Sequence, residues 1–314
     1  MASQGSWAEE PPPRTIKVEE SETQLAKWFA ARDAGESPFE YSLGVGLRQD
    51  SLRWSIADAG ANIASEVKWS SMFITQLRGA AKLNLPNNWQ VRGAISAGGV
   101  RSGNNQDSDF ADSNRTQEFS RSNNSSGGSA RDFSIAVGKK LRRADFPNGD
   151  TLHLVPLLGL SLHQQNFTMF NGVQTIPANG PFPGLGNGYD TKWQSAWAGL
   201  EALRGMGEKL TLNAKGEMHL VDYSAEANWN LRNDFAHPVS FKHSATGLGL
   251  ALGVGGTYRY NKNFLMNAAL DYQTWKTGGG KDQTFFAGGT TANFALNSVR
   301  WNSTSLNVEA AYQF

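Results

Sequence analysis

Alternation of apolar and polar residues is the dominant pattern along this chain. In residues 305–314, every second position from Leu306 to Phe314 is apolar, and the positions between are mainly Ser, Asn, Glu and Gln. A period of two is typical of a β-strand with one apolar and one polar face. The same pattern recurs in 248–258 and in 210–220, where the polar face carries Lys, Glu and His. A charged inner face suits a narrow, water-accessible lumen with paired charges, so the apolar face is expected to meet lipid.

Ten segments of this kind are predicted, each ending near turn-forming residues or a polar stretch. They cover 39–57, 64–85, 89–103, 129–143, 151–166, 190–205, 208–224, 245–260, 263–277 and 298–314. Tight turns are expected at 86–89, 145–150, 205–208 and 261–263, and long Asn/Ser/Gly-rich loops at about 104–128, 167–189, 225–244 and 278–297. Short turns at one end and long loops at the other are typical of bacterial outer-membrane barrels.

The predicted fold is therefore all-β: a ten-stranded antiparallel up-and-down transmembrane β-barrel occupying residues 38–314. The expected location is the bacterial outer membrane, with the long loops extracellular and both termini periplasmic. Closure into a barrel would leave no exposed sheet edge. Seven tryptophans in or near the ends of these segments are expected to form girdles at the two membrane interfaces; they are Trp54, Trp69, Trp89, Trp193, Trp197, Trp275 and Trp301.

Composition removes several classes of function. The formal net charge is +1 and no Lys/Arg-rich run is present, which argues against a nucleic-acid partner. Cysteine is absent, so disulfides, thiolate nucleophiles and Cys-ligated metals are excluded. The histidines and carboxylates show no metal-ligand spacing, and no cofactor is predicted. His219 is expected to be a hydrogen-bonded histidine of the barrel interior.

Residues 104–114, NNQDSDFADSN, pose the main chemical question of the sequence. Asp107 and Asp109 are two positions apart, so in an extended chain both would point to one face, where they could share a proton or hold a water. Loops also collect Asp, Asn and Ser, because these side chains hydrogen-bond to their own backbone at turns. A site and a solvated loop at the extracellular mouth are both consistent with the composition.

The chain from about Ser42 to Phe314 resembles the omptins, ten-stranded outer-membrane barrels that act as surface endoproteases. DSLRWSIADAGANIASEVKWS (50–70) looks like the first omptin hairpin, GYDTKWQSAWAGLEA (188–202) looks like the sixth strand, and SLNVEAAYQF looks like the closing strand. The resemblance implies catalysis by two facing pairs, an Asp-x-Asp and an Asp-x-His, in which the histidine acts as general base on a water. Asp107 and Asp109 match the first pair by spacing and by context.

The second pair has no match at its expected positions. Extending residues 219–230 without gaps puts these positions on Ala227 and Trp229, and neither side chain can take a proton from water. The displaced candidates nearby are Glu226, Asp234 and His237. Omptins also depend on lipopolysaccharide held by cations on their outer strand surface. The resemblance carries one such position onto Lys192 and another onto Asn166, which lacks the charge.

Residues 1–37 are predicted to be a periplasmic tail. EEPPPRTIKVEE is Pro-rich and charged, and SETQLAKWFAARDAG has a Ser cap, apolar residues and a closing Gly that favour a short helix. The tail could plug the lumen, lie on the membrane, dock a periplasmic protein partner or be a disordered leader.

Two classes of function remain open. The first is a non-proteolytic protein for surface binding or envelope structure, because only half of an omptin site is recognisable. The alternative is an omptin-type surface endoprotease that uses Asp107 and Asp109 with a displaced base. The expected partners are outer-membrane lipid or lipopolysaccharide and a peptide or surface ligand at the long loops. Fold alone does not choose between the two classes.

Overall fold

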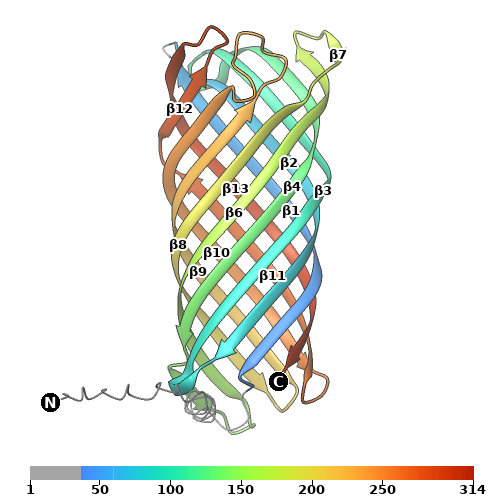
Figure 1. Cartoon of the computed structure of the whole chain (residues 1–314), viewed down its shortest axis with the longest axis vertical. Coiled ribbons are helices and arrows are strands. Elements are labelled where there is room, and N and C mark those ends of the chain that lie inside the picture. Colours follow the sequence, from blue (N-terminus) through green and yellow to red (C-terminus); the bar gives the residue numbers. More distant parts are fainter. Residues whose placement is uncertain (1–36, 59) are drawn as a thin grey trace, which may run out of the picture.

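A closed ring of ten antiparallel strands makes up the protein (Figure 1). The computed structural model describes residues 37–58 and 60–314. The predicted tail, residues 1–37, falls almost wholly outside the described residues. The ring strands are β1 (Phe39–Asp58), β2 (Ala61–Asn84), β3 (Trp89–Asp112), β4 (Thr116–Lys139), β6 (Thr151–Ile176), β8 (Asn187–Met206), β9 (Leu210–Asn228), β10 (Phe241–Arg259), β11 (Phe264–Thr277) and β13 (Thr291–Gln313).

The ring closes where the first strand pairs with the last. β1 and β13 run antiparallel from Glu40 opposite Gln313 to Ala57 opposite Ala295. Closure satisfies the backbone hydrogen bonds of both terminal strands, so neither is left as an open edge. The predicted up-and-down barrel is therefore confirmed. Among the described residues, no helix is long and apolar enough to cross a membrane.

The two ends of the barrel differ in the length of their connections. At the end that carries Phe314, here called the terminal end, the strands are joined by short turns, one of them the 3-10 turn η1 (Pro86–Asn88). At the other end, here called the hairpin end, lie the 3-10 turn η2 (Ser113–Arg115) and the short strands β7 (Gly180–Phe182) and β12 (Gly280–Phe285). β5 (Arg142–Asp145) pairs with β6. The predicted asymmetry between the two ends is confirmed.

The predicted long loops are mostly strand, which corrects the sequence analysis. β3 and β4 continue through 104–128 and turn only at η2, so NNQDSDFADSN lies in a strand and its first turn rather than in a solvated loop. The predicted loop 278–297 contains β12, which pairs with both β10 and β13. The outer faces of these strands are polar because they meet water beyond the lipid, and their inner faces also carry polar side chains such as Asn124 and Asp282, so alternation no longer marks them as strands in the sequence.

The outer surface carries a belt of exposed apolar side chains, as the alternation predicts. On β13, Leu306 and Val308 are about half exposed, whereas Asn307 between them is buried inside the barrel. On β9 and β10, exposed apolar side chains likewise alternate with residues that are buried inside the barrel. The belt includes Leu43, Val45, Leu47, Leu77, Ile95, Leu158, Leu160, Leu200, Met218, Leu220, Leu248, Val254, Leu270, Leu306 and Val308.

The tryptophans do not form the predicted girdles. Six of the seven are buried inside the barrel, and only Trp89 is substantially exposed. The alternation along each strand explains why the girdle prediction was wrong. Trp301 is on the same face of β13 as the lumen residues Ser303 and Asn307, and Trp193 is on the same face of β8 as Ser195. The exposed aromatic residues at the terminal end instead include Phe39, Tyr41, Trp89, Phe146, Tyr258, Tyr260, Phe264 and Phe314.

The half of the lumen nearer the terminal end is polar and contains a cavity of about 400 Å³. Its walls pair opposite charges, such as Arg78 with Glu309 at 2.7 Å and Arg92 with Glu201 at 2.6 Å. The predicted charge pairing in the lumen is confirmed. His219 is buried and its Nδ1 lies 2.9 Å from Ser195 Oγ, as expected of an interior histidine.

Candidate functional site at the mouth of the barrel

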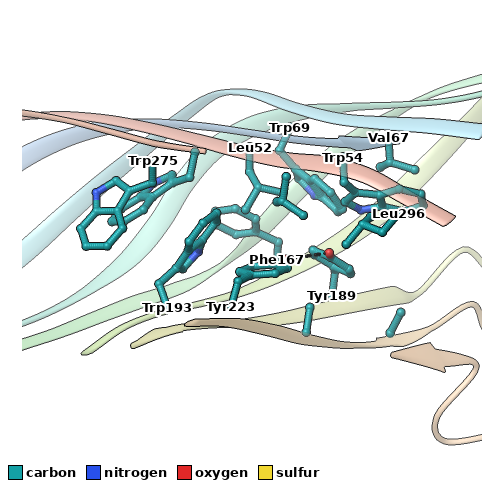
Figure 2. Close-up of a cluster of buried hydrophobic side chains, with 14 of the residues drawn as sticks. Leu52, Trp54, Val67, Trp69, Phe167, Tyr189, Trp193, Tyr223, Trp275 and Leu296 are labelled. Carbon is teal, nitrogen blue, oxygen red and sulfur yellow. Dashed lines mark hydrogen bonds between the residues drawn. The ribbon is translucent and has the colours of Figure 1, made fainter. Parts of the chain in front are cut away.

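Aromatic side chains pack across the lumen between the polar cavity and the hairpin end (Figure 2). Trp69 from β2 stacks on Tyr189 from β8, with ring centroids 5.1 Å apart. Trp193 and Tyr223, from β8 and β9, have centroids 4.3 Å apart. Strands on opposite sides of the ring therefore contact one another through their side chains. This aromatic cluster forms the floor of the mouth at the hairpin end.

Asp107 and Asp109 lie on β3 above this floor and point to the same side of the sheet. The cross-strand partners of Asp109 are Ser65 on β2 and Ser120 on β4. Both serines donate side-chain hydrogen bonds to the Asp109 carboxylate. Asp107 is flanked in the same way by Val67 and Ser122, and both aspartates are partly buried. The register thus holds the two carboxylates together at the rim of the lumen.

The two aspartates lie well beyond the apolar belt. The last strongly exposed apolar residue on β3 is Ile95, twelve positions before Asp107. With a rise of about 3.3 Å per residue and the usual strand tilt, this separation is roughly 30 Å along the barrel axis. The mouth therefore lies outside the membrane-spanning part of the barrel, in contact with water.

Burial and the neighbouring carboxylate favour the protonated form of Asp107. Desolvation, together with repulsion by Asp109, raises the pKa of Asp107 to about 7, although the Trp229 hydrogen bond and the charge of Arg232 act in the opposite direction. Desolvation also raises the pKa of Asp109, against the hydrogen bonds from its serines and the charge of Arg232. The pair can therefore hold one proton near neutral pH.

Trp229 faces Asp107 across the mouth. Its indole Nε1–H donates to Asp107 Oδ2 over 3.3 Å. The Trp229 backbone N–H donates to Ser240 Oγ over 2.9 Å, and the Ser240 backbone N–H donates to the Ala227 carbonyl, which fixes this residue at the end of β9. Ala227 is buried within the aromatic cluster. An indole N–H donates only, and alanine has no polar group, so neither residue offers a base to the aspartates.

The sequence of nearly the whole barrel matches the model of one protein family. The model of the family Pom, Protochlamydia outer membrane protein, matches residues 42–314. The chain belongs to the Pom family. It is thus an outer-membrane β-barrel, as the alternation predicts. No curated protein resembles this Pom family member closely enough to count as a match.

One solved structure shows the same kind of fold. The outer membrane protease OmpT from Escherichia coli superimposes with a TM-score of 0.73 at 14% identity, covering 90% of this chain and 98% of OmpT. The translocator domain of the autotransporter NalP from Neisseria meningitidis has a TM-score of 0.33 at 12% identity, covering 95% and 96% of the two chains. The Pom barrel is therefore omptin-like in fold, and the resemblance seen in the sequence is confirmed at that level.

The displaced candidates Asp234 and His237 lie in the segment between β9 and β10 and are not joined to each other. Asp234 is exposed and pairs with Arg232, whose Nη2 lies 2.8 Å from its Oδ2. His237 Nδ1 lies 2.8 Å from Asn228 Oδ1. The structure therefore brings Asp107 together with Asp109 and Trp229, whereas Asp234 and His237 each have a different partner.

A buried polar network below the mouth was missed by the sequence analysis. His243 Nε2 lies 2.8 Å from Asp282 Oδ2, and its Nδ1 lies 2.8 Å from the hydroxyl of Tyr189, which contacts the hydroxyl of Tyr223. Thr284 donates to the other oxygen of Asp282 over 2.7 Å. The network links β8, β9 and β10 of the Pom barrel to β12. Because 278–297 was expected to be a loop, no sequence signal placed Asp282 opposite His243.

Lys192, the candidate for lipid binding, lies on the outer face of β8. It is exposed, and its cross-strand partners are Gln164 on β6 and Ser224 on β9. The acidic residue Asp190 lies two positions from Lys192, and Asp222 and Glu226 lie two positions from its partner Ser224, all on the same outer face. Asn166 donates a hydrogen bond to Asp190 over 2.8 Å and adds no charge.

Proposed function

We propose that this Pom family member is a surface-binding protein whose mouth holds cationic groups of an extracellular ligand without cleaving it. In this proposal the hairpin end faces the outside of the cell and both termini face the periplasm, which agrees with the short turns at one end and the long hairpins at the other. The observation that carries the proposal is the hydrogen bond from Trp229 to Asp107, which puts an indole where an activated water would need a base.

The acidic pair suits a cation such as the side chain of Lys or Arg in an extracellular peptide. A bound cation favours the ionised carboxylates, so binding is expected to release a proton from Asp107. Affinity should then rise with pH through about 7, the pKa of Asp107 in the free protein. The aromatic floor would stop the ligand at the mouth.

The test measures binding and cleavage on the same peptides. The full chain would be refolded with lipopolysaccharide and mixed with fluorogenic peptides that contain paired basic residues. The expected result is saturable binding with no cleavage between pH 5 and 8, and loss of binding in Asp107→Asn with Asp109→Asn. The matched control, Asp190→Asn with Asp222→Asn, removes the same charge from the outer face and should bind normally. Cleavage that depends on Asp107 and Asp109 would overturn the proposal.

An omptin-type endopeptidase is the second candidate, and the raised pKa of Asp107 favours it. Two carboxylates that hold one proton near neutral pH resemble the pairs that aspartic peptidases use to activate water. The base would come from the segment that carries Asp234 and His237. This candidate predicts turnover that is lost in Asp107→Ala with Asp109→Ala and reduced in His237→Ala. Unchanged turnover in His237→Ala would exclude that histidine as the base.

We also propose that residues 1–37 dock a periplasmic protein. The charged, Pro-rich composition of this segment supports the idea. Cross-linking with residues 1–37 as bait should enrich one periplasmic protein, and the same bait with a scrambled sequence should not. Enrichment of nothing specific would count against the docking role.

A further inference from the structure

Four cationic residues stand side by side on neighbouring strands of the outer surface. On β2, β1, β13 and β11, the residues directly opposite one another are Lys68, Arg53, Arg300 and Lys276. Arg53, Arg300 and Lys276 are exposed. The residues after Arg53 and Arg300, Trp54 and Trp301, are buried inside the barrel, so this cationic row faces outward.

Three of the four charges in the cationic row are not neutralised by the described residues of the protein. Directly opposite residues on antiparallel strands have Cβ atoms about 5 Å apart, and like charges at that distance destabilise a sheet. Lys68 is held by Glu66, with Nζ 2.6 Å from Oε1. Among the ion pairs of residues 37–58 and 60–314, none involves Arg53, Arg300 or Lys276. Three adjacent exposed cations without an acidic partner indicate a site for an external anion.

The cationic row begins at the edge of the apolar belt. The next residue of the same cross-strand row is Leu248 on β10, the last exposed leucine of that strand before the polar residues Thr246 and Ser244. The strands are tilted (Figure 1), so each step from β10 toward β2 raises the row by about 3 Å. Arg300 and Arg53 then lie about 6 to 10 Å above Leu248, at the height of lipid headgroups.

We infer that the cationic row binds the phosphate group of an anionic lipid in the leaflet that meets the hairpin end. Two arginines can each offer a planar pair of N–H donors to phosphate oxygens, and Lys276 adds a point charge beside them. The acyl chains of that lipid would lie on the leucines of β10, where Leu248, Leu250 and Leu252 are exposed. Lys192 is on β8, three strands from β11 and five from β1 in the ring, so this site is separate from it.

The experiment compares one lipid with and without its phosphates. The full chain in detergent micelles would be titrated with bis-phosphorylated lipid A, with the same lipid after removal of both phosphates, and with inorganic phosphate. Arg53→Gln with Arg300→Gln should weaken binding of the phosphorylated lipid about thirtyfold. The matched control is Arg101→Gln with Arg131→Gln, which removes two exposed arginine charges from β3 and β4 and should change the affinity less than about twofold.

Thermal unfolding separates a binding role from a structural one. Without lipid, Arg53→Gln with Arg300→Gln should melt no lower than the wild type, because the substitution removes like charges that face each other. With phosphorylated lipid, the wild type should gain more in Tm than the variant. A lower Tm without lipid and an unchanged lipid-induced shift would overturn the inference. Equal losses of affinity in both double variants, or stabilisation by inorganic phosphate alone, would overturn it as well.

Discussion

At the scale of single residues, the chemistry of the mouth depends on the groups that surround Asp107. Asp109 and burial favour its protonated form, and the Trp229 indole and Arg232 favour its ionised form. The spacing of Asp107 and Asp109 was visible in the sequence, and so was the absence of a base at positions 227 and 229. The direct contact between Trp229 and Asp107 was not, because it joins residues on opposite sides of the ring.

Removal of the indole N–H should raise the pKa of Asp107 above about 7. In Trp229→Phe the ring remains and the hydrogen bond that stabilises the carboxylate is lost. The carboxyl C=O band in infrared spectra, followed from pH 4 to 9, would measure the shift. Trp89→Phe, at the terminal end, is the matched control and should leave the titration unchanged. An unshifted titration in Trp229→Phe would show that the indole hydrogen bond does not affect the pKa of Asp107.

Asp107 should also make the stability of the barrel depend on pH. Its pKa in the folded protein, about 7, is above the value of a free Asp side chain, so the folded state binds the proton more tightly. The resulting stabilisation is complete below about pH 4 and is lost as the pH rises through about 7. Urea midpoints at pH 4, 5.5 and 7.5 should therefore show this decline in the wild type and a smaller one in Asp107→Asn. If the urea midpoints of the wild type and of Asp107→Asn changed equally with pH, the raised pKa of Asp107 would be contradicted.

At the scale of elements, β12 is the piece that sequence reasoning missed. It is short, it begins at the third of three consecutive glycines, and its polar residues gave no alternation. Its position is fixed by pairing with β10 and β13, and by the contact between Asp282 and His243, both of which are buried. The extension of β3 and β4 was missed for the same reason, since pairing with neighbours holds these polar strands in place.

Asp282→Ala should loosen β12 and destabilise the hairpin end. The substitution leaves His243 and Thr284 without a buried acceptor, which costs about 2 kcal/mol in the free energy of unfolding. Hydrogen exchange should accelerate across 280–285 and stay unchanged in the belt portions of β9 and β10. Lys281→Ala, an exposed neighbour, is the control and should have little effect. Normal protection of β12 in Asp282→Ala would show that the network does not hold it.

At the scale of the whole molecule, closure of the ring determines which side chains meet. It brings Trp54 from β1 next to Tyr189 from β8 and Phe241 from β10, with ring centroids 5.9 and 5.7 Å apart. The same closure places Arg53 beside Arg300, although the two are far apart in the sequence. The aromatic cluster, the mouth and the cationic row therefore all depend on the pairing of β1 with β13.

A cross-link between the first and last strands tests this closure directly. The chain has no cysteine, so Val45→Cys with Val308→Cys would introduce the only two thiols. These positions face each other on the outer surface, within the Cα separation that a disulfide allows. Oxidation of the folded protein should give an intramolecular bond detectable by non-reducing electrophoresis. Val45→Cys with Val254→Cys, which are not paired, should give none, and equal cross-linking of both variants would contradict the register.

The sequence by itself determined the lipid-facing parts of the ten ring strands, their two faces and the pair of aspartates. It could do so because a strand has a fixed period of two, so each residue's side of the sheet can be read from its neighbours in the chain. Tertiary structure alone decided that the tryptophans fill the lumen, that Asp282 meets His243, and that Trp229 donates to Asp107. These contacts depend on register and ring closure, which pair residues far apart in the sequence and leave no local pattern to read.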